Sequence, residues 1–385
     1  MSASQATTAI LGGGQLARML ALAAAPLGLR TRFLDPSSDA VAGHVAEQIA
    51  GPFDDEDALH RLADGADVCT FEFENVPVAA TEWLMAHASV HPHPRALSAG
   101  QDRVHEKELF QRLGIGVAEF RAAATLAELR DAVAAVGAPC IVKTRRLGYD
   151  GRGQVRLAPD APGTPADAGL DIRIAAAFAE LTKDNDGGLI VEKLVPFVRE
   201  LSVIAVRSRG GEIACYPLAE NEHEGGILRR SRAPATNLTD ELQARAASIA
   251  ERLLAELDYV GVLAVELFEV GSGELIANEM APRVHNSGHW SIEGSVCSQF
   301  ENHMRAVHGL PLGSTAMQNG CVATMINLIG EMPPRAHTLA LPGVHLHDYG
   351  KQPRPHRKLG HATVVGHDRA AVDATAALIL AGSAS

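Results

Sequence analysis

The sequence predicts an α/β protein of about two or three domains, beginning with a doubly wound parallel sheet. Three observations support this fold class: the length of 385 residues, an alternation of short apolar strands and amphipathic helices over residues 1–100, and glycine-rich turns between later strands. The composition, 46% hydrophobic but only 4% aromatic, is typical of a folded chain with an aliphatic core.

Charge and cysteine content exclude several classes of partner. The net charge of -12 would repel nucleic acid and anionic membranes, so a phosphorylated ligand needs a local basic pocket. The five cysteines form no C-x-x-C pair, which predicts neither a disulfide framework nor a zinc site. Residues 1–8, M-S-A-S-Q-A-T-T, carry no basic residue, so we do not expect a signal peptide there. The longest mostly apolar stretch, residues 19–29, is too short to span a bilayer. We therefore expect a cytoplasmic protein that binds neither nucleic acid nor membrane.

The first domain is expected over residues 1–100. Residues 7–11 and 30–35 read as strands on either side of a turn and a helix over 15–27. A later strand over 67–73 carries Glu72 and Glu74 toward its carboxyl end. Ligands of doubly wound sheets lie beyond the carboxyl ends of the strands, so this end is the expected site.

A central domain is expected over residues 101–305 and a small C-terminal α/β domain over 306–385. The expected helices cover 101–113, 122–136 and 239–257; the expected strands cover 138–145, 154–157, 188–194, 200–207, 260–270, 274–280 and 321–328. Residues 158–169 are expected to form an exposed loop. A basic stretch over 351–361 and an alanine-rich helix complete the chain.

The first glycine motif is A-I-L-G-G-G-Q-L-A-R, residues 9–18. Gly12, Gly14 and Ala17 fit the dinucleotide fingerprint G-x-G-x-x-[GA], and Asp35 lies where a ribose-binding acid belongs. The same glycines could instead hold a single phosphate at the helix N-terminus, or only permit a tight turn. The motif alone leaves these three interpretations open.

A second glycine motif, L-G-Y-D-G-R-G-Q, lies between two expected strands at residues 147–154. It lacks the G-K-[ST] of a Walker A loop, but its glycines allow a hairpin to bend over phosphates, with Lys143 supplying a positive charge. Tyr149, Asp150 and Arg152 on such a loop indicate a lid over a reacting centre. The alternative is a surface hairpin with an incidental lysine.

The expected hairpin over 260–280 carries a carboxylate pair. A one-residue bulge in its G-S-G turn would place Glu266 opposite Glu279; without it, Glu266 faces Asn278. Carboxylate and amide oxygens on one face suit Mg²⁺ bound together with phosphate. The alternative is an edge hairpin whose carboxylates lie in water.

Two further segments could bind anions. The loop at 281–290 holds Arg283, His285, Asn286 and Ser287, while Gly288 argues against a helix that would pair His285 with His289 on zinc. It could also be an incidental polar loop. The late basic residues form either a solvated patch or a phosphate pocket: Lys351, Arg354, Arg357 and Lys358.

Taken in order, these motifs resemble the ATP-grasp superfamily and, within it, the N5-carboxyaminoimidazole ribonucleotide synthetase family. The resemblance rests on G-G-G-Q-L-A-R-M (12–19), F-E-F-E-N-V (71–76), G-Y-D-G-R-G-Q (148–154), N-E-M-A-P-R-V-H-N-S-G-H-W (278–290), M-I-N-L-I-G (325–330) and R-K-L-G-H (357–361). It implies an ATP-grasp fold with an N-terminal pre-ATP-grasp domain, a lid subdomain over residues 120–195, and a homodimer. It also implies carboxylation of 5-aminoimidazole ribonucleotide by ATP and bicarbonate, through carboxyphosphate, in purine biosynthesis.

The resemblance further implies the following site residues. ATP would contact Arg103, Lys143, Gly148, Tyr149, Asp150, Gly151, Arg152, Gly153, Gln154, Glu192, Lys193, Leu194, Val195, Glu200, His223, Asn278 and Glu279. Mg²⁺ would be held by Glu266 and Glu279. The aminoimidazole nucleotide would contact Gly14, Gln15, Leu16, Glu74, Tyr149, Asn286, Ser287 and Arg357. The catalytic set would be Asp150, a candidate proton acceptor, with Arg152, Arg283, His285 and Lys351.

In this interpretation the opening turn binds the aminoimidazole nucleotide near its phosphate, and Asp35 is an ordinary strand-end acid. Two residues depart from the family pattern: Leu147 stands where glycine is frequent, and His356 stands where R-P-G-R-K is usual. The rival functions are another ATP-grasp ligase, such as a formate-using glycinamide ribonucleotide transformylase, an NAD-dependent oxidoreductase, and a non-catalytic nucleotide-binding regulator.

Overall fold

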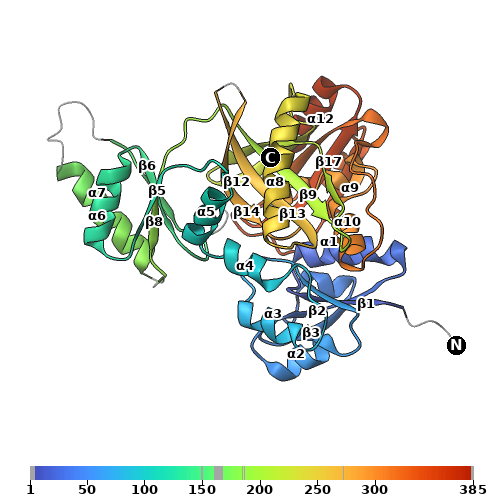
Figure 1. Cartoon of the computed structure of the whole chain (residues 1–385). Helices are drawn as coiled ribbons and strands as arrows, with labels where there is room; N and C mark the ends of the chain where they lie inside the picture. The colour runs from blue at the N-terminus through green and yellow to red at the C-terminus, as the bar shows by residue number, and fades with distance from the viewer. Residues whose placement is uncertain are drawn as a thin grey trace.

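The computed structural model describes residues 5–148, 151–159, 168–183, 185, 187–271 and 273–382. The strands of these residues form three sheets, here called the N-terminal, lid and central sheets. In Figure 1 the N-terminal sheet lies below, the lid sheet stands to the left, and the central sheet lies to the right. None of the described helices is both long and apolar enough to cross a membrane.

The N-terminal sheet is parallel, with the order β3-β2-β1-β4. Its elements are β1 (Thr7–Leu11), α1 (Gln15–Ala24), η1 (Ala25–Leu27), β2 (Arg30–Asp35), η2 (Val41–His44), β3 (Glu47–Ala50), α2 (Glu56–Ala63), β4 (Val68–Phe71), α3 (Val78–Met85) and α4 (Pro94–Gly100). The chain leaves β1 toward β2 on one side and returns to β4 on the other. Such a reversal opens a crevice beyond the carboxyl ends of the two strands, which are followed here by the G-G-G turn and by Glu72 to Glu74.

The lid sheet is antiparallel, with the order β5-β8-β6-β7. Its elements, preceded by α5 (Arg103–Arg112), are β5 (Phe120–Ala123), α6 (Leu126–Val136), β6 (Cys140–Thr144), β7 (Gln154–Leu157), α7 (Ala168–Thr182) and β8 (Leu189–Lys193). The helix expected over 122–136 begins only at Leu126, because Thr125 and Glu128 form a capping box and the preceding residues pair with β8. Most of the loop expected over 158–169 lies outside the described residues, and its last two residues begin α7.

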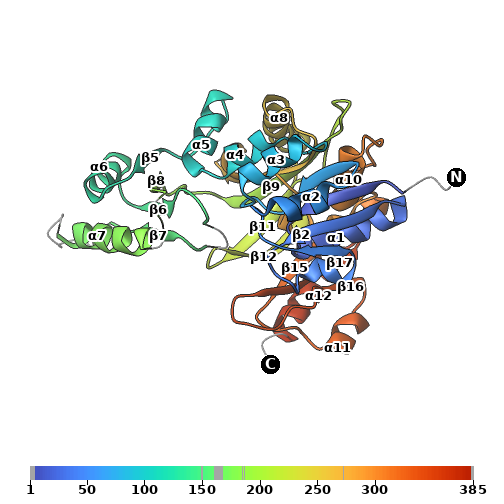
Figure 2. The same cartoon turned by 90° about the horizontal axis from the view of Figure 1, so that it is seen from below.

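The central sheet has the order β14-β13-β9-β11-β12-β15-β17-β16, and β10 pairs with β9. Its elements are β9 (Arg199–Arg207), β10 (Ile213–Cys215), β11 (Ala219–Glu224), β12 (Ile227–Ala233), α8 (Asp240–Glu256), β13 (Gly261–Val270), β14 (Glu274–Ala281), η3 (Asn286–Gly288), α9 (Ser291–Gly294), α10 (Gln299–Val307), η4 (Gln318–Gly320), β15 (Val322–Ile329), α11 (Arg335–Ala340), β16 (Val344–Asp348), β17 (Lys358–Gly366) and α12 (Arg369–Gly382). The expected boundary between residues 305 and 306 falls inside α10, and β12 pairs with β15 across it. Figure 2 shows α11 and α12 beyond β15 and β17, at the C-terminal end of the molecule.

Helix α10 attaches the N-terminal sheet to the central sheet. It packs on α1, and two histidines, one in the helix and one directly after it, reach the first sheet: His303 Nε2 lies 3.0 Å from Thr70 Oγ1, and His308 Nε2 lies 2.7 Å from Thr8 Oγ1. Burial lowers the pKa of His303 to about 3, so this histidine is neutral and can bond to a hydroxyl without a buried charge. The crevice beyond β1 and β4 is thereby fixed against the central sheet.

Candidate active site

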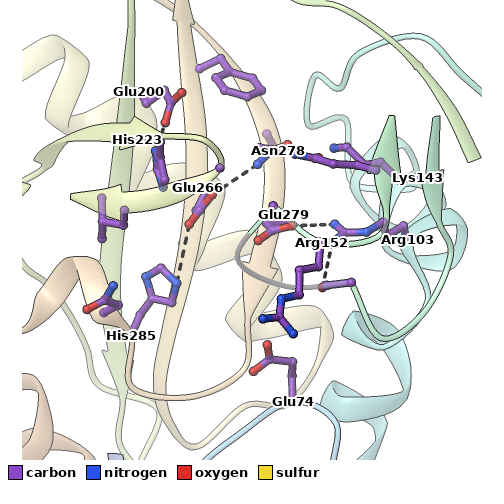
Figure 3. A pocket seen from close by; sticks show the side chains of 18 of the residues that line it. Glu74, Arg103, Lys143, Arg152, Glu200, His223, Glu266, Asn278, Glu279 and His285 are labelled. Carbon is purple, nitrogen blue, oxygen red and sulfur yellow. Dashed lines mark hydrogen bonds and ion pairs between the residues drawn. The ribbon is translucent and has the colours of Figure 1, made fainter. Parts of the chain in front are cut away.

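A cleft of about 690 Å³ lies where the three sheets meet. Its walls come from the carboxyl ends of β1 and β4, the lid sheet, the β13–β14 hairpin and the loop that follows β14. Figure 3 shows the charged side chains that point into it. Residues from 15 to 358 of the chain therefore share one cavity.

The β13–β14 hairpin places two carboxylates side by side. Glu266 pairs with Glu279, while the neighbouring Leu267 pairs with Ala277, so Asn278 is the extra residue of a bulge. Of the two registers that the sequence left open, the structure has Glu266 opposite Glu279, but the bulge lies in β14 and not in the G-S-G turn. The Asn278 Nδ2 atom donates to Glu266 Oε2 at 3.3 Å, so the bulge brings a third oxygen-bearing side chain to the pair.

The two glutamates have opposite electrostatic surroundings. Burial, followed by repulsion from Glu279, raises the pKa of Glu266 to about 7. Burial also tends to raise the pKa of Glu279. The opposite effect of Arg103 is larger, because its Nη1 atom lies 2.6 Å from Glu279 Oε2, and the pKa of Glu279 is lowered to about 2. A divalent cation between the two carboxylates would favour ionisation of both.

These oxygens fit Mg²⁺ only as part of a larger ligand set. Among the described residues, no group of three or more histidine, cysteine, aspartate or glutamate side chains could hold a metal ion. Two carboxylates and an amide therefore leave positions for water and for the phosphate oxygens of a bound nucleotide, as is usual for Mg²⁺.

Cationic side chains face the carboxylates from the lid side. Lys143 Nζ lies 3.1 Å from Glu192 Oε2, and Lys107 Nζ lies 3.2 Å from the same oxygen. Burial lowers the pKa of Lys143, and Glu192 opposes that shift. The motifs did not single out Lys107, although it lies four residues after Arg103 on α5 and so shares a helix face with it.

The glycine-rich motif forms the expected hairpin between β6 and β7. The Arg103 Nη2 atom donates to the carbonyl of Gly148 at 3.1 Å, and Arg152 extends toward Glu74 in Figure 3. Tyr149 and Asp150 lie outside the described residues.

Both departures from the family pattern adopt a glycine conformation. Leu147 has a φ of 62° and His356 a φ of 61°, in the left-handed region that glycine enters without strain. The backbone at these two positions therefore has the left-handed conformation that a glycine adopts readily.

The far end of the cleft has an apolar wall and an acid–histidine pair. The rings of Phe197 and Phe268 stack with centroids 4.7 Å apart beside Leu194 and Val195. Glu200 accepts a hydrogen bond from Nδ1 of His223. This hydrogen bond raises the pKa of His223 against the effect of burial.

The opening glycine turn is occupied by the chain's own carboxylates. Glu72 accepts hydrogen bonds from the amides of Gly14 at 2.8 Å and Ala17 at 3.1 Å, and Asp35 accepts one from Gly13 at 2.8 Å. Asp35 ends β2, as expected, and in addition its carboxylate holds the glycine turn through the amide of Gly13. The amide of Gly14, near which we expected the nucleotide phosphate, donates to Glu72 in this structure.

The segment after β14 connects the carboxylate pair to the N-terminal sheet. Arg283 forms an ion pair with Glu74. His285 Nε2 lies 3.6 Å from Glu266 Oε1, and its Nδ1 bonds to Ser287 Oγ at 2.8 Å. Burial lowers the pKa of His285 to about 3, so it is a neutral hydrogen-bonding group.

The structure brings most of the expected residues to the cleft. Its lining includes Gln15, Leu16, Glu74, Arg103, Lys143, Gly148, Gly151, Arg152, Gln154, Glu192, Lys193, Leu194, Val195, Glu200, His223, Glu266, Asn278, Glu279, Arg283, His285 and Asn286. Expected residues that are described but lie outside the lining are Gly14, Gly153, Ser287, Lys351 and Arg357. Of these, Lys351 is adjacent, since its Nζ lies 2.5 Å from Oε1 of Gln15. Lys358 lines the cleft in place of Arg357.

Comparison with protein-family models divides the chain into three matched parts. Residues 5–101 match the ribonucleotide synthetase preATP-grasp domain, residues 108–300 the ATP-grasp domain, and residues 323–375 the phosphoribosylaminoimidazole carboxylase C-terminal domain.

Similar proteins cover almost the whole chain. The N5-carboxyaminoimidazole ribonucleotide synthase of Pseudomonas aeruginosa is 48% identical over 365 residues, which is 95% of this chain and 96% of that protein. The crystal structure of the synthetase from Thermus thermophilus is 48% identical, with a TM-score of 0.88 over 98% of this chain and 99% of that one. The synthase from Aspergillus clavatus in complex with ADP and 5-aminoimidazole ribonucleotide is 30% identical, with a TM-score of 0.88 over 99% of each chain.

Proposed function

This chain belongs to the N5-carboxyaminoimidazole ribonucleotide synthase family of ATP-grasp enzymes, and on that premise we propose which of its residues carry out the family's reaction. The chain is an ATP-dependent ligase of purine biosynthesis. It carboxylates 5-aminoimidazole ribonucleotide to the N5-carboxyamino product, using ATP. One observation supports the assignment of residues: the cationic side chains, the carboxylate pair and the residues beyond the carboxyl ends of β1 and β4 all line one cleft.

The ATP end of the cleft is formed by the lid and central sheets. Arg103 and Lys143 face the phosphates, and the backbone of residues 192–195 faces adenine. The ribose hydroxyls are bound by Glu200, with His223 beside it. The burial of Lys143 supports this assignment, because a positive charge in a low-dielectric wall attracts phosphate more strongly than one in water.

Mg²⁺ would be held by Glu266 and Glu279, together with Asn278 and phosphate oxygens of the nucleotide. When bound, it supplies positive charge to the phosphates of ATP. The support is the donor set itself: two partly buried carboxylates that face each other and repel, a repulsion that a bound cation would offset.

The reaction proceeds in two steps through carboxyphosphate. An oxygen of bicarbonate attacks the γ-phosphorus and ADP leaves; the amine of the aminoimidazole nucleotide then attacks the carbonyl carbon, phosphate leaves and the amine gives up a proton. Asp150 is the proposed proton acceptor, while Arg152, Arg283 and neutral His285 position the reactants. Gln15, Leu16, Glu74, Asn286, Lys351 and Lys358 surround the aminoimidazole nucleotide; Lys358 replaces Arg357 because it lines the cleft. We also propose that the enzyme is a cytoplasmic homodimer.

The test is a measurement of ADP release at fixed bicarbonate, with and without 5-aminoimidazole ribonucleotide, together with incorporation of labelled bicarbonate into the nucleotide. We expect one labelled carbon per ADP, and ADP release that depends on the aminoimidazole nucleotide. Turnover with formate and glycinamide ribonucleotide instead would overturn the proposal, as would tight binding of NADH without ATP turnover.

A further inference from the structure

The turn between β11 and β12 connects the central sheet to the glycine-rich loop. Gly225 and Gly226 join the paired residues Glu224 and Ile227, with φ values of +59° and +80°. Positive φ at both central residues is the conformation that a two-residue hairpin turn of type I′ requires. Gly226 lines the cleft, three residues after His223.

Gly226 meets Gly151 of the glycine-rich loop backbone to backbone. A Cβ atom on Gly226 would lie 2.6 Å from the Cα of Gly151 and 3.2 Å from its nitrogen. A Cβ atom on Gly151 would likewise lie 3.1 Å from the Cα of Gly226 and 2.6 Å from the carbonyl oxygen of Gly225. Both distances of 2.6 Å are shorter than van der Waals contact, so this approach is possible only between two residues without side chains. A Cβ on Gly225 would meet nothing within 4 Å.

This contact lies where the loop reaches the central sheet. The loop is held at its other side by the lid sheet, through β6 and β7, and by the hydrogen bond from Arg103 to Gly148. Arg152 follows Gly151 directly and faces the cleft. The position of Gly151 on the turn therefore also determines where the guanidinium of Arg152 can reach.

We propose that Gly226 is a positioning residue, on which the glycine-rich loop docks so that Arg152 is held over the reacting groups and water is kept away from carboxyphosphate. This inference rests on the proposed function. In the productive step the amine nitrogen forms a bond to the carbonyl carbon, the bond to phosphate breaks, and the amine proton passes to a base. If water attacks the same carbon, bicarbonate and phosphate are regenerated, and the net reaction is hydrolysis of ATP.

The test compares Gly226→Ala with Gly225→Ala. Both variants place alanine at positive φ in the same turn, so they share the backbone strain, but only Gly226→Ala puts a methyl group against Gly151. The readout is labelled bicarbonate incorporated per ADP released, since a loss of folded protein lowers both rates and leaves their ratio unchanged. For Gly226→Ala we expect the ratio to fall by about threefold or more and the rate of product formation by about tenfold or more. Gly225→Ala should keep the wild-type ratio.

An unchanged ratio in Gly226→Ala, with rates equal to those of Gly225→Ala, would overturn the inference. If Gly226→Ala does not fold, Gly151→Ala tests the same contact from the loop, and an unchanged ratio there would equally overturn it. Absence of labelled product from the wild type would instead contradict the proposed function, so the two failures are distinguishable.

Discussion

Replacing Glu279 by glutamine tests the carboxylate pair with almost no change of shape. The variant removes the negative charge that Arg103 contacts at 2.6 Å and that the cation site shares with Glu266. A hydrogen bond to a charged partner contributes about 1.5–3 kcal/mol. Because 37% of the Glu279 side chain is exposed, we take the lower end of that range, about 1.5 kcal/mol. Lost from the transition state, this energy corresponds to a turnover rate about tenfold lower. Loss of one of two carboxylate ligands should add about another tenfold to a hundredfold through weaker cation binding.

The assay is ATP turnover with 5-aminoimidazole ribonucleotide and bicarbonate, measured over a titration of Mg²⁺. For Glu279→Gln we expect turnover to fall by about a hundredfold or more, and half-saturation to need more Mg²⁺. The matched control is Glu274→Gln, because this exposed glutamate lies on the same strand and outside the cleft lining. Turnover of Glu279→Gln at the wild-type rate, with the wild-type Mg²⁺ dependence, would refute the role assigned to this carboxylate.

Three other predictions follow from the described contacts. Glu72→Gln turns an amide NH₂ toward the backbone donors of Gly14 or Ala17, so we expect the free energy of unfolding to fall by about 1–3 kcal/mol and the Tm to drop. Relative to wild type, the KM should rise more for the aminoimidazole nucleotide than for ATP, and a KM that rises only for ATP would contradict this. The pKa of His303 is about 3 in the folded protein and ordinarily 6.5, so unfolding takes up a proton at acidic pH. The free energy of unfolding therefore falls as the pH drops below 6.5, by about 2 kcal/mol at pH 5. In thermal melts, the Tm of His303→Asn should decrease less between pH 7 and pH 5 than that of the wild type. ATP at about a hundred times its Kd should stabilise the fold by about 2.7 kcal/mol, and a Tm unchanged by ATP would exclude the binding site.

Local patterns were sufficient to predict the elements that carry most of the site. The β13–β14 hairpin follows from two mostly apolar segments on either side of a G-S-G turn. The pairing of Glu266 with Glu279 was predicted as one of the two registers that such a turn allows. The position of the bulge was not predicted, because an inserted residue shifts register equally whether it lies in the turn or at Asn278. Strand β5 was read in part as the start of a helix, since A-A-A-T-L-A-E-L has strong helical propensity and only pairing with β8 makes Phe120–Ala123 a strand.

The sequence did not predict the contacts between segments that are far apart along the chain. Lys107 and Glu192 come from α5 and β8, and nothing in either local sequence shows that the two charges meet at 3.2 Å. The same limit applies to Gly226 and Gly151, which lie in turns of different sheets. Such pairs depend on how the lid and central sheets pack, which local periodicity does not determine.

The opening glycine turn shows why a dinucleotide fingerprint need not bind a dinucleotide. Its spacing lets a negatively charged group approach the amides at the start of α1, but in this chain that group is Glu72: a Cβ on Gly14 would lie 2.6 Å from Glu72 Oε1. A pyrophosphate at the same amides would have to displace a buried carboxylate and leave it without the two hydrogen bonds that offset its burial. The glycine requirement at position 14 is therefore explained by an internal carboxylate. We accordingly expect the second substrate to be bound by side chains beside the turn, where Gln15 and Lys351 already contact each other at 2.5 Å, and not by its backbone amides.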